Sequence, residues 1–192
     1  MAYIRRMRKL GHRVFLLYHV DRPELTHPQK DDFPMRAMRW EGKRLAADIK
    51  REIALFAPAI AHVWDMWSHG LAAALECSIV ANARLIIHLE DDLLDVWKRR
   101  QRGAWSKKPF DLIFKGINNK AELLAMLKQC DLDACFKPGC APQTPNFDPL
   151  LFWFAAHAAD GFSAIWHPLK QRLENAFGKP VLLLPPGFEN HN

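Results

Sequence analysis

Hydrophobic positions along the chain switch between helical spacing and short continuous runs. Near the start, Ile4, Met7 and Leu10 recur three residues apart among basic residues, and Gly11 follows as a helix-ending residue. This pattern predicts a basic amphipathic helix. The apolar run at 13–20 then predicts a strand after a very short turn, which is typical of α/β units.

The rest of the chain repeats this alternation. In chain order the pattern predicts a short strand at 35–40, a helix over 45–56, a strand at 59–64, a helix over 68–80, a strand at 83–87, a helix over 150–157, a strand at 161–165, a helix over 167–177 and a strand at 181–184. Helices alternating with strands predict a single α/β domain with a Rossmann-like, doubly wound parallel sheet. The looser stretch at 95–148 is predicted to be an insertion that carries a helix at 121–129.

The composition agrees with one globular domain. The chain has 192 residues, of which 49% are hydrophobic, and this is enough to bury a core. Its net charge is +6 with acidic residues interspersed, so we expect a moderately basic surface that suits an anionic partner and does not require nucleic acid. No apolar run approaches the roughly 18 residues that a membrane span needs, and the first residues lack the apolar stretch of a signal peptide. A cytoplasmic location is therefore expected.

Three cysteines, Cys130, Cys135 and Cys140, are evenly spaced, with His157 further on. Structural zinc sites usually bring their ligands in close pairs two to four residues apart, and no such pair occurs here. We therefore expect no metal, and ordinary thiols in a reducing compartment.

The strand predicted at 83–87 runs directly into His88-Leu89-Glu90-Asp91-Asp92. Open α/β sheets bind ligands outside the carboxyl ends of their strands, which makes His88 and Glu90 candidates for chemistry. The alternative is a loop in which the acidic residues open the next helix through its dipole and His88 only caps the strand.

Four motifs, taken in their order along the chain, resemble those of a known family. The matching pieces are MRKLGHRV at 7–14, AIAHVWD at 59–65, ARLIIHLEDD at 83–92 and GKPVLLLPPGF at 178–188. Together they resemble the N-terminal domain of GT-B fold glycosyltransferases, family 4-like, a large family that includes sucrose synthase and bacterial mannosyl- and heptosyl-type transferases. The resemblance covers most of the chain except residues 95–148.

This resemblance implies the acceptor-side half of a retaining, metal-independent hexosyltransferase. The nucleotide sugar is the donor substrate and no cofactor is expected, while a saccharide or a lipid-linked hydroxyl is the acceptor. Residues 1–187 correspond to the acceptor domain and 188–192 to the start of an interdomain linker. The donor-binding C-terminal domain of the family is absent, so we expect a second domain or chain to complete the enzyme.

The resemblance also assigns roles to particular residues. His88 matches a histidine that faces the donor sugar and helps to align the reaction, which a neutral imidazole suits because it hydrogen-bonds and shuttles protons near neutral pH. Substrate-binding roles fall on Asp65, Trp67, Ser68, His69 and Glu90. Aromatic residues there would stack on a sugar ring, and the helix start at Ser68, its expected N-cap, would hold an anion. The alternative for the tryptophans is core packing.

The start of the chain departs from the family pattern. Family members open with a strand and a Gly-rich turn before the helix that is predicted here at 4–10, and that strand lies in the middle of the sheet. Without it, two neighbouring strands would keep unpaired backbone groups, which is costly when they are buried. We therefore expect either that the true start lies upstream or that another strand or chain fills the gap.

A basic run at 98–102 is flanked by Trp97 and Trp105. Tryptophan favours membrane interfaces and basic residues attract anionic head groups, so this run predicts peripheral contact with the inner face of a membrane or with a polyprenyl phosphate acceptor. A solvated loop is the alternative. For the whole chain, the alternative function is a non-catalytic binding or scaffold protein that descends from such a domain and pairs with another chain.

Overall fold

The computed structural model describes residues 2–19, 34–42, 44–64, 66–90, 122 and 149–184. The elements are α1 (Ala2–Lys9), β1 (Leu16–Tyr18), β2 (Met35–Ala37), β3 (Trp40–Glu41), β4 (Arg44–Leu45), α2 (Ala47–Phe56), β5 (Ile60–Trp64), α3 (Ser68–Ala81), β6 (Arg84–Leu89), α7 (Pro149–Ala158), β7 (Gly161–Ala164), α8 (His167–Phe177) and β8 (Val181–Leu183). No helix in these ranges is both long and apolar enough to cross a membrane.

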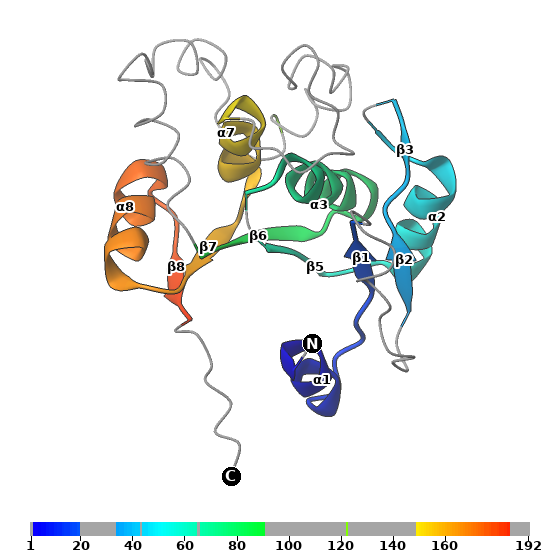
Figure 1. The fold of residues 1–192 in the computed structure, drawn as a ribbon, viewed down its shortest axis with the longest axis horizontal. Coiled ribbons are helices and arrows are strands. Elements are labelled where there is room, and N and C mark those ends of the chain that lie inside the picture. Colours follow the sequence, from blue (N-terminus) through cyan, green and yellow to red (C-terminus); the bar gives the residue numbers. More distant parts are fainter. Residues whose placement is uncertain are drawn as a thin grey trace.

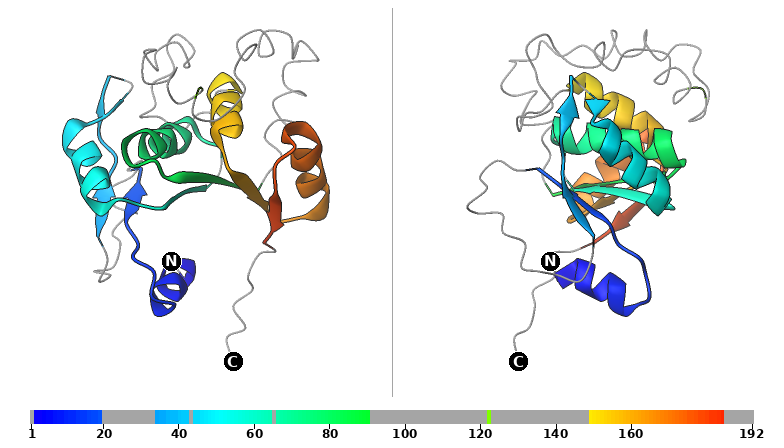
Figure 2. Two further views of the ribbon diagram at one scale, coloured as in Figure 1. Left: turned by 180° about the vertical axis from the view of Figure 1, so that it is seen from behind. Right: turned by 90° about the vertical axis from the view of Figure 1, so that its right-hand side faces the viewer.

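The centre of the molecule is a four-stranded parallel sheet with the strand order β5-β6-β7-β8 (Figure 1). Helices flank it, so the predicted α/β class is confirmed and the arrangement is consistent with a Rossmann-like fold. Consecutive strands advance across the sheet in one direction, and right-handed crossovers then place the intervening helices on the same face. Figures 1 and 2 show α3 and α7 on this face, while α1 lies on the other side of the sheet.

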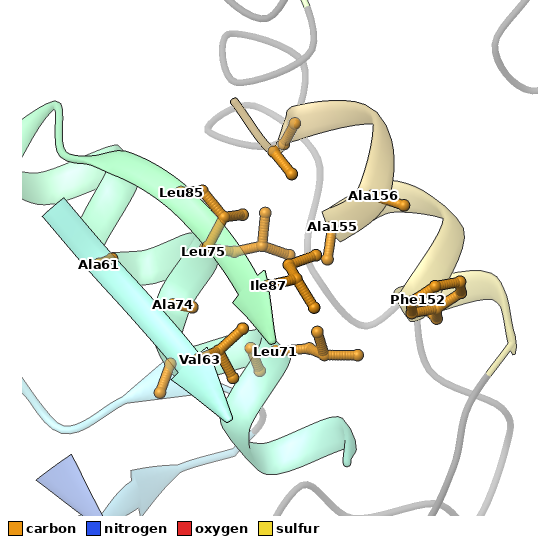
Figure 3. Packing of buried hydrophobic residues seen from close by; sticks show 14 of the residues in the cluster. Ala61, Val63, Leu71, Ala74, Leu75, Leu85, Ile87, Phe152, Ala155 and Ala156 are labelled. Carbon is orange, nitrogen blue, oxygen red and sulfur yellow. The ribbon is translucent and has the colours of Figure 1, made fainter. Parts of the chain in front are cut away.

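The core lies between the sheet and these helices. Side chains alternate along a strand, so Ala61 and Val63 of β5 and Leu85 and Ile87 of β6 point to the helical layer (Figure 3). Small residues of α3 and α7 meet them there, including Ala74, Ala155 and Ala156. The Ala-rich helices predicted from the sequence therefore pack closely on the sheet because their side chains are short.

A second parallel pair, β1 and β2, forms a separate small sheet. It is attached through α2, where the Phe15 and Phe56 rings lie 5.5 Å apart and Arg36 pairs with both carboxylate oxygens of Glu52 at 2.8 and 2.9 Å. Among the described strands, β1 pairs with β2 alone and β5 with β6 alone. Within the described residues, β1–β2 and β5–β8 are therefore separate sheets, with no strand pairing between β1 and β5.

Several predicted boundaries differ from the structure, and two of the differences have a clear cause. The helix expected from Leu45 begins at Ala47, because Leu45 pairs with Trp40 in a short antiparallel hairpin whose turn contains Gly42 at a φ of 63°. The strand expected to end at Ile87 continues to Leu89, because His88 and Leu89 pair with Ser163 and Ala164 of β7. His88 is therefore inside a central strand and not in the loop after it.

Several predictions fall outside the described residues. These are Asp65, Asp91 and Asp92, the basic run at 98–102 with Trp97 and Trp105, the cysteines at 130, 135 and 140, and the linker at 188–192. Of the predicted helix at 121–129, position 122 alone is described, and it is helical.

Candidate functional site

The candidate site lies where β5, β6 and β7 approach their carboxyl ends. His88 of β6 stands directly opposite Trp64 of β5 and Ser163 of β7 in the strand register. Since opposite residues share a face, all three side chains point away from the face that holds Val63 and Ile87. We call these three residues, together with His62 and Glu90, the strand-end cluster.

His88 is the buried centre of the strand-end cluster. Its ring is 2% exposed, and its Nδ1 lies 2.8 Å from Oγ of Ser163, which is equally buried. If the hydroxyl donates to Nδ1, the neutral ring carries its proton on Nε2. Nε2 faces the carboxylate of Glu90, with 3.8 Å to Oε1. Ser163 can therefore fix both the orientation and the tautomer of His88, a role that no local sequence signal indicated.

The solvent-facing part of the cluster is made by Trp64 and Glu90. The indole covers His88, with 4.1 Å between the ring centroids, and its Nε1–H donates to Oε1 of Glu90 at 2.9 Å. Trp64 is 50% exposed and the Glu90 side chain 51%. An aromatic face and a carboxylate with a free acceptor direction are thus presented side by side.

His62 completes the cluster and was missed in the sequence. It shares the exposed face of β5 with Trp64, and its ring stands edge-on to His88 with 6.0 Å between centroids. Although the side chain reaches solvent, lost hydration lowers the pKa of His62 from 6.5 to about 4, and the nearby His88 adds a smaller lowering. His62 is therefore neutral at neutral pH. Its position two residues before Trp64 on a strand was the available signal.

The second predicted group lies at the start of α3. Ser68 was expected to be the N-cap, but Trp67 occupies that position without a side-chain cap hydrogen bond, and Ser68 is the first helical residue. Ser68 is completely buried, which does not suit direct contact with a substrate in solution. Trp67 is half-buried.

His69, in the first turn of α3, contacts a residue from a distant part of the chain. Its ring lies 4.3 Å from the ring of His19, which directly follows β1. The carboxyl end of β1 and the start of α3 are therefore neighbours. His19 was not a predicted site residue, because the sequence alone does not show which strand end approaches α3.

The described ranges contain no group of three His, Cys, Asp or Glu side chains arranged to hold a metal ion. Cys77 of α3 is a buried free thiol. Burial and the adjacent negative charge of Glu76 raise the pKa of its thiol to about 12, so it stays protonated and unreactive. The strand-end cluster itself offers imidazole, indole, hydroxyl and carboxylate groups.

Comparisons with known proteins found no protein-family model, no curated protein and no solved structure that matches the chain. The glycosyltransferase hypothesis therefore rests on the sequence motifs and on the geometry of the strand-end cluster.

Proposed function

We propose that the strand-end cluster binds a carbohydrate, and that the chain is the acceptor-side half of a glycosyltransferase. Such an enzyme moves a sugar from a nucleotide sugar to a hydroxyl of a saccharide or of a lipid-linked acceptor. The supporting observation is the half-exposed indole of Trp64, held by Glu90 at the carboxyl end of a parallel sheet. An indole is flat and apolar with one polar edge, so it suits the apolar face of a sugar ring.

The neighbouring groups supply the polar contacts that a sugar needs. The Glu90 carboxylate accepts the Trp64 N–H with one oxygen, and its other oxygen can accept a hydrogen bond from a sugar hydroxyl. Hydrogen bonds to an ionised carboxylate are stronger than those between neutral groups. Ligand sites commonly combine an aromatic wall with a few polar groups of this kind.

His88 is the catalytic candidate of this proposal, but its ring lies beneath Trp64 and is 2% exposed. Direct contact with a donor sugar therefore requires that the indole moves aside when the substrates bind. A neutral imidazole held by Ser163 would then present Nε2–H to a hydroxyl or a phosphate oxygen. The donor itself would be held by a second domain or chain, and the nucleotide sugar is a substrate and not a cofactor.

Titration calorimetry on the full chain tests the carbohydrate site. The probes are glucose, mannose and N-acetylglucosamine for the acceptor, and UDP-glucose and GDP-mannose for the donor. We expect a saccharide to bind and Trp64→Ala to weaken it roughly tenfold or more, since the stacking surface is lost. Trp166→Ala is the matched control, because Trp166 is 42% exposed and precedes α8, outside the cluster. Equal losses in both variants would contradict the site.

Incubation with nucleotide sugars and an acceptor tests the half-enzyme part of the proposal. We expect neither transfer nor donor hydrolysis by residues 1–192 alone, because in this proposal a second domain or chain holds the donor. Activity that appears after a family C-terminal domain is added, and is lost in His88→Asn, would support the assignment. Robust transfer by the chain alone would contradict it.

A non-catalytic partner protein is the second candidate function. It is favoured by the apolar side chains of Ile60 and Leu182, which are 58% and 61% exposed on the sheet face that carries the strand-end cluster. Light scattering with the chain alone and with a family C-terminal domain separates the candidates. Stable association without saccharide binding would favour the partner protein over the enzyme half.

A further inference from the structure

The first helix stands apart from the rest of the molecule. Figures 1 and 2 show α1 on the opposite side of the sheet from α3 and α7, joined to the body through residues 10–15. Leu10, which closes the helix with its N–H donated to the carbonyl of Arg6, is 66% exposed. The helix therefore presents a surface of its own.

That surface is divided into two arcs. At about 100° per residue, Ile4, Met7 and Leu10 fall within roughly 120° of the helix circumference. Four cations fill the opposite arc, namely Arg5, Arg6, Arg8 and Lys9, and all four are exposed.

The charged side chains of the first 20 residues have one sign. No Asp or Glu occurs in residues 1–20, and the last turn of α1 carries Arg6, Arg8 and Lys9. Arg13 is engaged elsewhere, since its guanidinium lies over the Phe56 ring and donates to the Phe56 carbonyl. Arg6 and Lys9 are exposed cations of α1 that a negatively charged partner can meet.

We propose that α1 docks the protein on the surface of an anionic lipid bilayer. The helix lies in the plane of the interface, with Ile4, Met7 and Leu10 at the acyl boundary and the cations among the head groups. Basic side chains bury their apolar stems beside such a surface and keep their charge in water. A charged face opposite an apolar face is the pattern of interfacial helices. A nucleic acid would also attract the cations, but its phosphate backbone does not use an apolar stripe in which Ile4 and Met7 are partly exposed and Leu10 is 66% exposed.

Co-sedimentation with lipid vesicles tests this docking surface with the full chain. We expect binding to phosphatidylcholine vesicles that contain phosphatidylserine, weaker binding at high salt, and little binding to pure phosphatidylcholine. Each basic residue near an anionic surface strengthens partitioning roughly fivefold, so Arg6→Glu/Lys9→Glu should weaken it by about a hundredfold or more. Leu10→Ser should weaken it as well, since it removes apolar contact without changing charge.

The matched control is Lys50→Glu/Arg51→Glu on α2, which changes the net charge equally at another surface. It should keep most of the binding. Equal loss in the control, or no effect of Leu10→Ser, would overturn docking through α1. Tight binding to a single-stranded RNA oligonucleotide with none to vesicles would also overturn it. Circular dichroism verifies that each variant is folded. The vesicle result is independent of saccharide binding, so either proposal can fail alone.

Discussion

His88 shows how the surroundings of one residue decide its role. Its place after an apolar run indicated a polar group at a strand end, and this location is close to what the structure shows. The sequence contained no sign that Ser163, 75 residues later, would hold Nδ1, or that Trp64 would cover the ring. Because His88 is buried beneath the half-exposed Trp64 and beside Glu90, a ligand from solvent contacts Trp64 and Glu90 first.

The lowered pKa of His62 predicts how the stability of the protein depends on pH. Its pKa is about 4 in the folded state and ordinarily 6.5, so between these values the unfolded chain binds a proton that the folded chain does not. The free energy of unfolding should therefore fall as the pH falls from about 6.5 towards 4. His62→Gln should flatten this part of the profile.

Urea unfolding at a series of pH values measures the effect, which solvent around the exposed ring will reduce. An NMR titration of the His62 ring gives its midpoint directly. A midpoint near the ordinary value, or an unchanged slope in the variant, would show that the ring is not desolvated as described.

Among the elements, α3 contacts helices and strands from several parts of the chain. It lies against β5 and β6 on one side and beside α2 and α7 on others. The sequence predicted a helix over 68–80, and the structure confirms it as a largely buried helix against the sheet. The hairpin of β3 and β4 was not predicted, because strands of two residues are too short to show an alternating pattern.

An ion pair joins this hairpin to α3. Glu76 is completely buried, and Arg44 of β4 donates to both of its carboxylate oxygens. Arg44→Met would leave a buried carboxylate uncompensated, and we expect the free energy of unfolding to fall by about 3–5 kcal/mol. Arg44→Met/Glu76→Met should recover much of this loss.

The control for this prediction is Arg36→Met. Arg36 pairs with Glu52 at the surface, where its side chain is 57% exposed, so the loss should stay below about 1 kcal/mol. Denaturant unfolding compares the three variants. Similar losses for Arg36→Met and Arg44→Met would mean that burial of Glu76 does not set the strength of the pair.

At the scale of the whole molecule, the two faces of the sheet are unequal. One face meets the helices and forms the core, where the Phe162 ring of β7 stacks on Phe177 of α8 at 5.2 Å. The other carries the strand-end cluster and exposes Ile60, Trp64 and Leu182. An apolar sheet face of this kind commonly marks an interaction site.

Matched side-chain truncations on the neighbouring strands β7 and β8 test whether one face of the sheet is buried and the other exposed. Phe162 is 2% exposed and Leu182 is 61% exposed, on opposite faces of β7 and β8. Phe162→Ala should lower the free energy of unfolding by about 3–5 kcal/mol, because it opens a cavity in the core. Leu182→Ala should change it by less than about 0.5 kcal/mol. A comparable loss in Leu182→Ala would show that the second face is covered in solution.

Within the described residues, the sequence by itself determined the longer helices and strands, their order, the α/β class and the strand that carries His88, but not the β3–β4 hairpin. These follow from spacing and local propensity, which act over a few residues. Only the tertiary structure decided that the sheet divides between β1 and β5, that His88 lies beneath Trp64 on Ser163, and that His19 meets His69. Register and packing bring together residues that are far apart in the chain, and no local pattern encodes those distances.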